Sequence, residues 1–200
     1  MLEAIEMNIQ GSIITDIFKD ISFAQEEIVM IENKFEKLVL KKKDVLLKSG
    51  NTAHYQYYIS SGCLRTYFVD NSGKEHTVQF AIKDWWISDY TAFFTASKAV
   101  MTIDCIQNAI VYKVSKKDIE SLYIEIPQVE TFFRKKMEFA FASFQKRIIG
   151  NLSQSTKDKY TSFINTYPNI EQSVKNYHIA SYLGVTTETL SRIRKEISQK

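Results

Sequence analysis

The chain has 200 residues, of which 44% are apolar and 24% charged, the balance of a soluble globular protein with enough length for a hydrophobic core. Two prolines and six glycines are too few for a low-complexity or collagen-like chain. No run approaches the roughly 18 consecutive apolar residues of a membrane span, so we expect no membrane partner. The N-terminus, MLEAIEMNIQ, has no basic run and predicts no secretory signal, which makes a cytoplasmic location the expectation.

The net charge of +3 is unevenly distributed along the chain. Residues 126–200 hold 12 basic and 6 acidic side chains, whereas residues 1–125 hold 14 and 17. This asymmetry indicates that the C-terminal part meets an anion. The two cysteines, Cys63 and Cys105, match no CxxC pattern, and we expect buried free thiols rather than a disulfide or redox pair.

The N-terminal third changes its periodicity near residue 36. Residues 12–34 have apolar side chains at helical spacing, with a second start near Ser22. Beyond them, short segments rich in β-branched and aromatic residues predict a β-sandwich or β-roll. Residues 71–74 predict a hairpin turn between strands 64–69 and 76–80. A second strand pair is predicted at 101–106 and 109–114, turning at Gln107 and Asn108.

Residues 128–152 predict one long amphipathic helix, because they contain no proline and repeat apolar side chains every three or four positions. Five phenylalanines between 132 and 144 make its apolar face unusually wide. The helix could be buried within one monomer, but we favour packing against a twin helix in a homodimer. A hinge near 150–155 is expected to separate it from a small helical unit in which Ser155 or Thr156 caps a helix that Pro168 ends.

Residues 177–197 have the local signals of two short helices joined by a tight turn. Ala180 is small enough for a close helix crossing, and Gly184 stands where the chain must turn left-handed. Thr186 can cap the second helix. Its inward stripe consists of Leu190, Ile193 and Ile197. The pattern predicts a helix-turn-helix with its second helix in a DNA major groove.

The opposite face of that second helix carries short polar and basic side chains: Thr187, Glu188, Ser191, Arg192 and Lys195. Arginine can bond guanine in bidentate fashion, and glutamate can accept from cytosine N4. Thr189 and Arg194 lie towards the flanks and suit phosphate contact. A helical hairpin with a merely solvated face is the alternative, and the combined glycine, cap and charge pattern favours double-stranded DNA.

The whole order of parts resembles the Crp/Fnr family of bacterial transcription regulators. The segment IASYLGVTTETLSRIRK is similar to that family's helix-turn-helix, and DVLLKSGN, YYISSGCLRTYF and NSGKEHTVQF are similar to its β region. The resemblance implies an α+β fold with an N-terminal double-stranded β-helix (a β-roll, cyclic nucleotide-binding-like), a long dimerisation helix and a C-terminal helix-turn-helix. It also implies that Thr187, Glu188 and Arg192 occupy base-reading positions, with Ser191 and Lys195 as neighbouring contacts.

From this resemblance we expect three parts, a sensor at 1–125, a dimerisation helix at 126–152 and a DNA-binding domain at 153–200. The expected partners are DNA, a second copy through helix 128–152, a small-molecule effector and RNA polymerase. The chain ends soon after the recognition helix, so we expect no C-terminal β-hairpin wing.

The chain departs from the family where cyclic nucleotides bind. Those members carry a Gly-Glu pair and an Arg-Ser or Arg-Thr pair, whereas Asp89 and Lys98 are the only stand-ins here, beside Ala99. A lysine lacks the planar guanidinium of a bidentate phosphate clamp, so the effector is unknown and is not expected to be cyclic AMP. Trp85, Trp86, Tyr90, Phe93 and Phe94 could line an effector pocket, but core and domain-contact roles are favoured.

We expect no cofactor and no metal. An iron–sulfur cluster needs a set of cysteines near the N-terminus, and the first cysteine is Cys63. Haem ligation by His54, His76 or His178 is weighed against structural roles, which single histidines more often have.

Two further functions are weighed against DNA binding. In one, the β-roll binds a ligand or partner and the C-terminal helices mediate protein interaction. The other is an enzyme, and no Ser-His-Asp order, metal cluster or phosphate loop supports it. We therefore predict a sequence-specific, DNA-binding regulator that is not an enzyme.

Overall fold

A computed structural model describes residues 12–168 and 170–199 of the chain. The segment MLEAIEMNIQ, for which no secretory signal is expected, lies outside the described residues. The helices and strands, in chain order, are α2 (Ile13–Ile17), α3 (Gln25–Glu32), β1 (Glu36–Leu40), β2 (Val45–Leu47), β3 (Tyr55–Ser61), β4 (Leu64–Val69), β5 (Glu75–Ala81), β6 (Trp86–Ile87), α4 (Tyr90–Thr95), β7 (Thr102–Cys105), β8 (Ala109–Ser115), α5 (Lys116–Glu125), α6 (Pro127–Ser153), α7 (Thr156–Thr166), the 3₁₀ turn η1 (Ile170–Gln172), α8 (Asn176–Leu183) and α9 (Thr187–Ser198). Among these elements no helix is both long and apolar enough to cross a bilayer.

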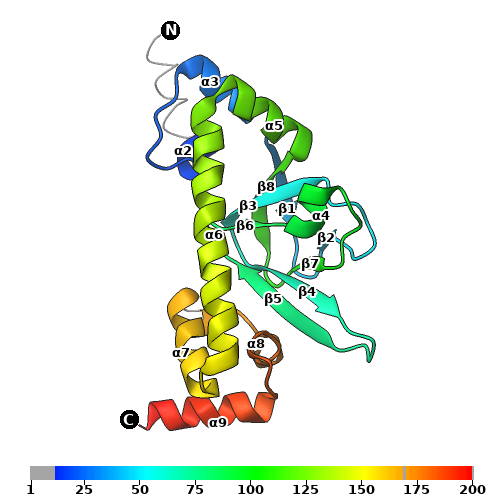
Figure 1. The fold of residues 1–200 in the computed structure, drawn as a ribbon, viewed down its shortest axis with the longest axis vertical. Coiled ribbons are helices and arrows are strands. Elements are labelled where there is room, and N and C mark those ends of the chain that lie inside the picture. Colours follow the sequence, from blue (N-terminus) through cyan, green and yellow to red (C-terminus); the bar gives the residue numbers. More distant parts are fainter. Residues whose placement is uncertain (1–11, 169, 200) are drawn as a thin grey trace.

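The strands form two four-stranded antiparallel sheets, with orders β1-β8-β3-β6 and β2-β7-β4-β5. Their facing sides bury a common core that includes Ile59, Leu64 and Val111. The α+β fold predicted from the sequence is confirmed: antiparallel sheets precede the long helix, which the C-terminal helices follow (Figure 1).

One predicted strand pair is wrong. Strands β7 and β8 do form at 102–105 and 109–115, but they lie in different sheets, β7 beside β4 and β8 beside β3. The link between them does not close a hairpin, because the amides of Ile106 and Gln107 both donate to the carbonyl of Cys63. Asn108 is likewise committed elsewhere, since its side-chain oxygen accepts from the amide of Lys42.

The predicted hairpin at 71–74 is confirmed. The Asp70 carboxylate accepts hydrogen bonds from the amides of Ser72 and Lys74, and Gly73 takes a left-handed φ of 84°. The Ser72 hydroxyl and His76 also bond this carboxylate and hold its pKa well below the ordinary value. These local hydrogen bonds in the turn therefore set the pairing register of β4 and β5, in which Val69 lies opposite Glu75.

The N-terminal helical region is two short helices, in agreement with the second start predicted near Ser22. Ser12 caps α2 by accepting from the amide of Ile14, and the helix ends at Phe18, before Asp20 takes a left-handed φ of 68°. Phe18 and Ile31 pack with the first turns of α6 in a second core. These helices thus brace the start of α6 against the β-roll.

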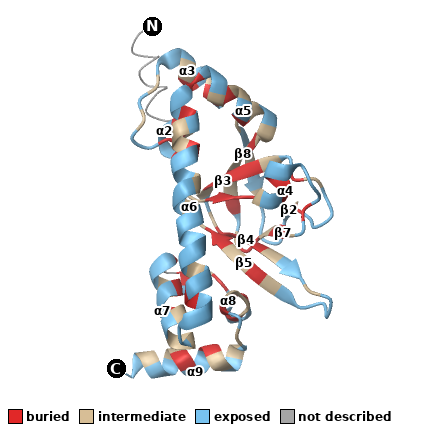
Figure 2. Cartoon of the chain, viewed as in Figure 1, coloured by how far each residue is buried: buried red, intermediate tan, exposed pale blue. Residues whose placement is uncertain are grey.

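The predicted long helix is confirmed as α6, 27 residues with Pro127 in its first turn. Its first third is anchored by Val129 and Phe133, which are buried against the sheet side. Near its other end Gly150 is buried and Arg147 donates to the Val78 carbonyl of β5. Figure 1 shows α6 running along most of the molecule, and Figure 2 shows its middle largely exposed. It connects the β-roll to helices α7 to α9.

Two glycines with nearly the same backbone angle provide a test of packing at the β3–β4 turn. Gly62 has a φ of 89°, and a Cβ there would lie 2.3 Å from the Asn108 carbonyl oxygen and 2.7 Å from Ala109. Gly73 has a φ of 84° and open space around it. We predict that Gly62→Ala lowers the free energy of unfolding by about 1–3 kcal/mol more than Gly73→Ala, because both strain φ but only the first also clashes. Urea unfolding of the two variants measures this, and equal losses would contradict it.

Candidate nucleic-acid interface

Helices α8 and α9 form the predicted helix-turn-helix. Gly184 ends α8 with a φ of 70°, and the Val185 amide donates to the Ala180 carbonyl at 3.0 Å. Thr186 then caps α9 by accepting from the amide of Thr189 at 3.2 Å. The predicted turn and cap are confirmed, and both follow from local residue chemistry.

The apolar sides of the two helices meet as the spacing predicts. Leu190 and Ile193 of α9 and Ile179 of α8 are buried in one cluster. Ser155 caps α7, as one of the two predicted candidates, and Tyr160 and Phe163 of that helix complete the cluster. This small core fixes which side of α9 faces outward.

The outward side of α9 carries the predicted contact residues. Glu188, Ser191, Arg192 and Lys195 are exposed, whereas Thr187 and Thr189 are half-buried at the first turn. The Ser191 hydroxyl donates to the Thr187 carbonyl at 2.9 Å. Helix α9 lies at the end of the molecule opposite α3 (Figure 1).

Glu188 is held as a carboxylate at the start of α9. Its own backbone amide and the hydroxyls of Thr186 and Thr187 lower its pKa. An ionised carboxylate in the first helical turn is also favoured by the helix dipole. At neutral pH this side chain can therefore only accept hydrogen bonds.

Arg194 does not point where the sequence suggests. We expected a phosphate contact, but its guanidinium turns inward and bonds Asn176 at 2.6 Å and Tyr160 at 3.1 Å. Nη2 of Arg194 also lies 2.8 Å from Glu171. The helical spacing did not reveal this, because the partners come from α7, η1 and α8. Arg194 thus ties the small domain together, and the expectation of a phosphate contact is corrected.

The helix-turn-helix unit is docked on the β-roll. Phe80 of β5 lies with its ring centroid 6.0 Å from that of Phe163 and 5.6 Å from that of Tyr182. Trp85 packs on Tyr167 at 5.1 Å between centroids. The sequence favours a core or domain-contact role for Trp85 over an effector pocket, and the structure shows a domain contact.

The stand-ins for a cyclic-nucleotide clamp have other roles. Asp89 is fully buried and caps α4, accepting from the amides of Ala92, Val100 and Met101 at 3.1, 2.9 and 3.1 Å. Lys98 donates to the Thr52 hydroxyl at the surface. The Asp89 carboxylate is therefore occupied by backbone amides and does not imitate a ribose-binding glutamate.

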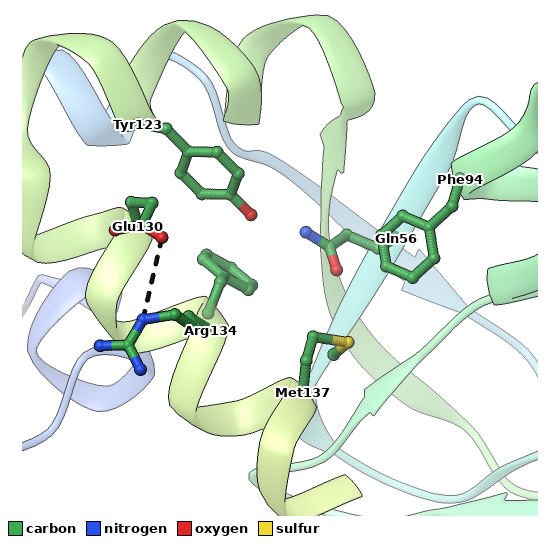
Figure 3. A pocket seen from close by; sticks show the side chains of 7 residues that line it. Gln56, Phe94, Tyr123, Glu130, Arg134 and Met137 are labelled. Atoms are coloured by element: carbon green, nitrogen blue, oxygen red, sulfur yellow. Dashed lines mark ion pairs between the residues drawn. The ribbon is translucent and has the colours of Figure 1, made fainter. Parts of the chain in front are cut away.

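A small cleft lies between the β-roll and helices α5 and α6 (Figure 3). Its volume is about 170 Å³. Its polar groups are the buried amide of Gln56, the Tyr123 hydroxyl and the Glu130–Arg134 pair at 4.0 Å. Phe94, Phe133 and Met137 supply its apolar lining. Of the five aromatic residues considered for an effector pocket, Phe94 is the one that lines this cleft.

The two thiols are buried within the protein. Cys63 and Cys105 are free and buried, and burial raises the pKa of each thiol to about 12. They belong to different core clusters, on opposite sides of their sheet. In residues 12–168 and 170–199, no three His, Cys, Asp or Glu side chains are grouped to hold a metal ion.

Comparisons with known proteins agree with this architecture. The cyclic nucleotide-binding domain family matches residues 37–125. An anaerobic regulatory protein of Haemophilus influenzae is 23% identical over 183 residues, covering 84% of this chain and 70% of the relative. The regulatory protein HlyX of Actinobacillus pleuropneumoniae is 21% identical over 201 residues, covering 92% and 81%. The solved structure of FixK2 from Bradyrhizobium japonicum shares the fold, with a TM-score of 0.70 at 14% identity, covering 82% of this chain and 85% of that one.

A β-roll, a long helix and a helix-turn-helix in this order are the architecture that the chain shares with FixK2. With these relatives, the chain is a DNA-binding transcription regulator that is similar to those of the Crp/Fnr type. The relatives are regulators and not enzymes, in agreement with the sequence-based prediction.

Two arginines on α9 provide a matched test of this geometry. We predict that Arg194→Ala lowers the free energy of unfolding by about 1–3 kcal/mol, because it removes charged hydrogen bonds to partly buried partners. Arg192→Ala on the exposed side is expected to change it by less than about 0.5 kcal/mol. Thermal and urea unfolding of both variants measures the difference, and an equal loss would show that Arg194 is not a structural tie.

Proposed function

We propose that this regulator binds a two-fold related DNA site as a homodimer, reading bases with Thr187, Glu188, Ser191 and Arg192. The observation that supports this most is the exposed polar side of α9 beside its buried apolar side. Arg192 would bond guanine, and the Glu188 carboxylate would accept from cytosine N4. Thr189 and Lys195 would contact phosphates at the flanks of the same helix. The proposal keeps the division into a sensor at 1–125, a dimerisation helix at 126–152 and a DNA-binding domain at 153–200.

The dimer is supported by the exposed apolar side of α6. Phe141 is 65% exposed and Leu152 is 84% exposed, and Phe144 and Ile148 are exposed between them. Phe141, Phe144 and Ile148 follow each other at intervals of three and four, which is the spacing of a coiled-coil seam. So much apolar surface along one helix is unusual unless a partner covers it. A second copy of α6 is the partner whose surface has the same pattern.

The signal is proposed to enter through the β-roll. The cleft lined by Gln56, Tyr123 and Arg134 borders both the β-roll and α6, so a small polar effector bound there would contact the sensor and the dimerisation helix together. The occupied Asp89 carboxylate disfavours a cyclic nucleotide as that effector. A DNA target and two free thiols suit a cytoplasmic location. Contact with RNA polymerase stays a prediction.

Base reading by Arg192 is tested with a site selected by the wild-type protein from random duplexes. We predict that Arg192→Ala weakens binding to that site by about 1–3 kcal/mol and binding to random DNA much less, because one bidentate base contact is lost. Gel shifts at fixed salt measure both. Lys195→Ala is the control, expected to weaken both duplexes alike. An equal loss on both duplexes for Arg192→Ala would make Arg192 a phosphate contact only.

The dimer is tested on α6 itself. We predict that Phe141→Ser with Phe144→Ser raises the dimer dissociation constant at least about 100-fold, because two aromatic side chains leave the seam. Sedimentation equilibrium measures it. Ile124→Ser on α5 is the matched control, since Ile124 is 85% exposed and lies off the seam. A dimer that survives the double substitution would place the interface elsewhere.

A further inference from the structure

Arg65 of β4 is a buried charge that reaches from the β-roll into the helix-turn-helix. The residue is only 4% exposed. Its guanidinium bonds both oxygens of Asp104 on β7, at 2.9 and 3.1 Å. Nη1 lies 2.7 Å from Glu75 on β5 and 2.7 Å from Nδ1 of His178 on α8. One side chain thus joins three neighbouring strands to the first helix of the DNA-binding motif.

The contact between Arg65 and His178 has a defined polarity. A guanidinium can only donate, so Nδ1 of His178 accepts and the ring proton sits on Nε2. Burial, followed by the charge of Arg65, lowers the pKa of His178 to about 4. The imidazole is therefore neutral at physiological pH, the form that this hydrogen bond requires.

A second set of hydrogen bonds pairs backbone groups on the open edge of the sheet with side chains of α8 and α6. Strand β5 is the last strand in the order β2-β7-β4-β5. On its open side the Thr77 amide donates to the Ser181 hydroxyl at 2.9 Å, and that hydroxyl donates to the Glu75 carbonyl at 2.8 Å. Arg147 of α6 donates to the Val78 carbonyl. Edge strands leave such groups unpaired unless another element covers them, and here α8 and α6 do so beside β5 (Figure 1).

The polar ties add direction to an apolar contact. The aromatic cluster around Phe80 holds the two units together, but burial of apolar surface is non-directional. A guanidinium fixed by Asp104 in bidentate geometry accepts few orientations of its third partner. Arg65 and Ser181 therefore select one angle between α8 and the β-roll.

That angle matters for DNA. Helix α9 follows α8 after the Gly184 turn and moves with it. Two recognition helices of a dimer must match half-sites about 34 Å apart, one turn of the duplex. We propose that Arg65 is a positioning residue for DNA binding, which through His178 sets the separation of the two α9 helices. The inference rests on the proposed dimer and its DNA site.

The test uses the full-length chain and leaves the Arg65 ion pairs intact. His178→Leu removes the acceptor while Asp104 and Glu75 still pair Arg65, which avoids an uncompensated buried charge. His178→Asn is the conservative variant, because its side-chain oxygen can accept in place of Nδ1. Arg192→Ala serves as a reference that loses a base contact without touching the tie.

Binding is measured on the selected site and on versions with one or two base pairs inserted at its centre. Wild type is expected to bind the native spacing best. His178→Leu should lose about tenfold in affinity for the native spacing and much less for the altered spacings. The difference in affinity between the spacings should therefore become smaller than in wild type. His178→Asn should recover most of the preference. Arg192→Ala should weaken every spacing by a similar factor. An unchanged spacing preference in His178→Leu would overturn the proposal.

A second measurement needs no DNA. The Thr77 amide is bonded to Ser181, so its hydrogen exchange reports docking of α8 on β5 directly. Exchange should become about tenfold faster in His178→Leu and stay near wild type in His178→Asn. Unchanged exchange in His178→Leu would overturn the tie. If exchange responds but wild type shows no sequence preference on any duplex, the proposed DNA-binding dimer fails and the tie itself stands.

Discussion

The packing of Phe133 on its neighbours fixes where the long helix α6 starts on the β-roll. Its ring meets Trp86 of β6 at 4.9 Å between centroids and Phe18 at 6.1 Å. This contact fixes the first turns of α6 on the β-roll and leaves the rest of the helix without a core of its own. The remaining length of α6 then presents an apolar side outward and brings α7 to α9 back to strand β5. The position of the helix-turn-helix unit therefore depends on this anchored start of α6 together with the unit's own contacts to β5.

Arginines that are paired within the chain differ from exposed ones in what they can offer to DNA. Arg194 and Arg65 are used up within the chain, each by two or more partners. Arg192, two residues from Arg194 on the same helix, is exposed. A charge that is already paired has little to offer a phosphate or a base, whereas an exposed one keeps its hydrogen-bonding capacity. The net positive charge of residues 126–200 therefore includes basic side chains, such as Arg194, that are not free to contact DNA.

The β-roll matches the cyclic nucleotide-binding domain family while the side chains considered for a nucleotide clamp make other contacts. The backbone amides of α4 and β7 occupy Asp89, and Lys98 lies at the surface. The cleft against α5 and α6 is instead lined by an amide, a hydroxyl and an ion pair. The fold is thus similar to that of cyclic-nucleotide binders, but the polar groups that line the cleft differ from their nucleotide clamp. The fold therefore does not identify the ligand.

Features that depend on local chemistry could be predicted from the amino-acid sequence. Gly184, the Thr186 cap and the spacing of Leu190 and Ile193 specify the helix-turn-helix, because each acts within one helical turn. The hairpin at Asp70 and the long helix could be predicted in the same way. Three contacts between distant segments became visible in the folded chain alone: β7 and β8 lie in different sheets, Arg194 turns inward and Arg65 meets His178. Arg65 and His178 are 113 positions apart in the sequence. A pattern within one segment holds no information about which distant side chain completes a buried hydrogen bond.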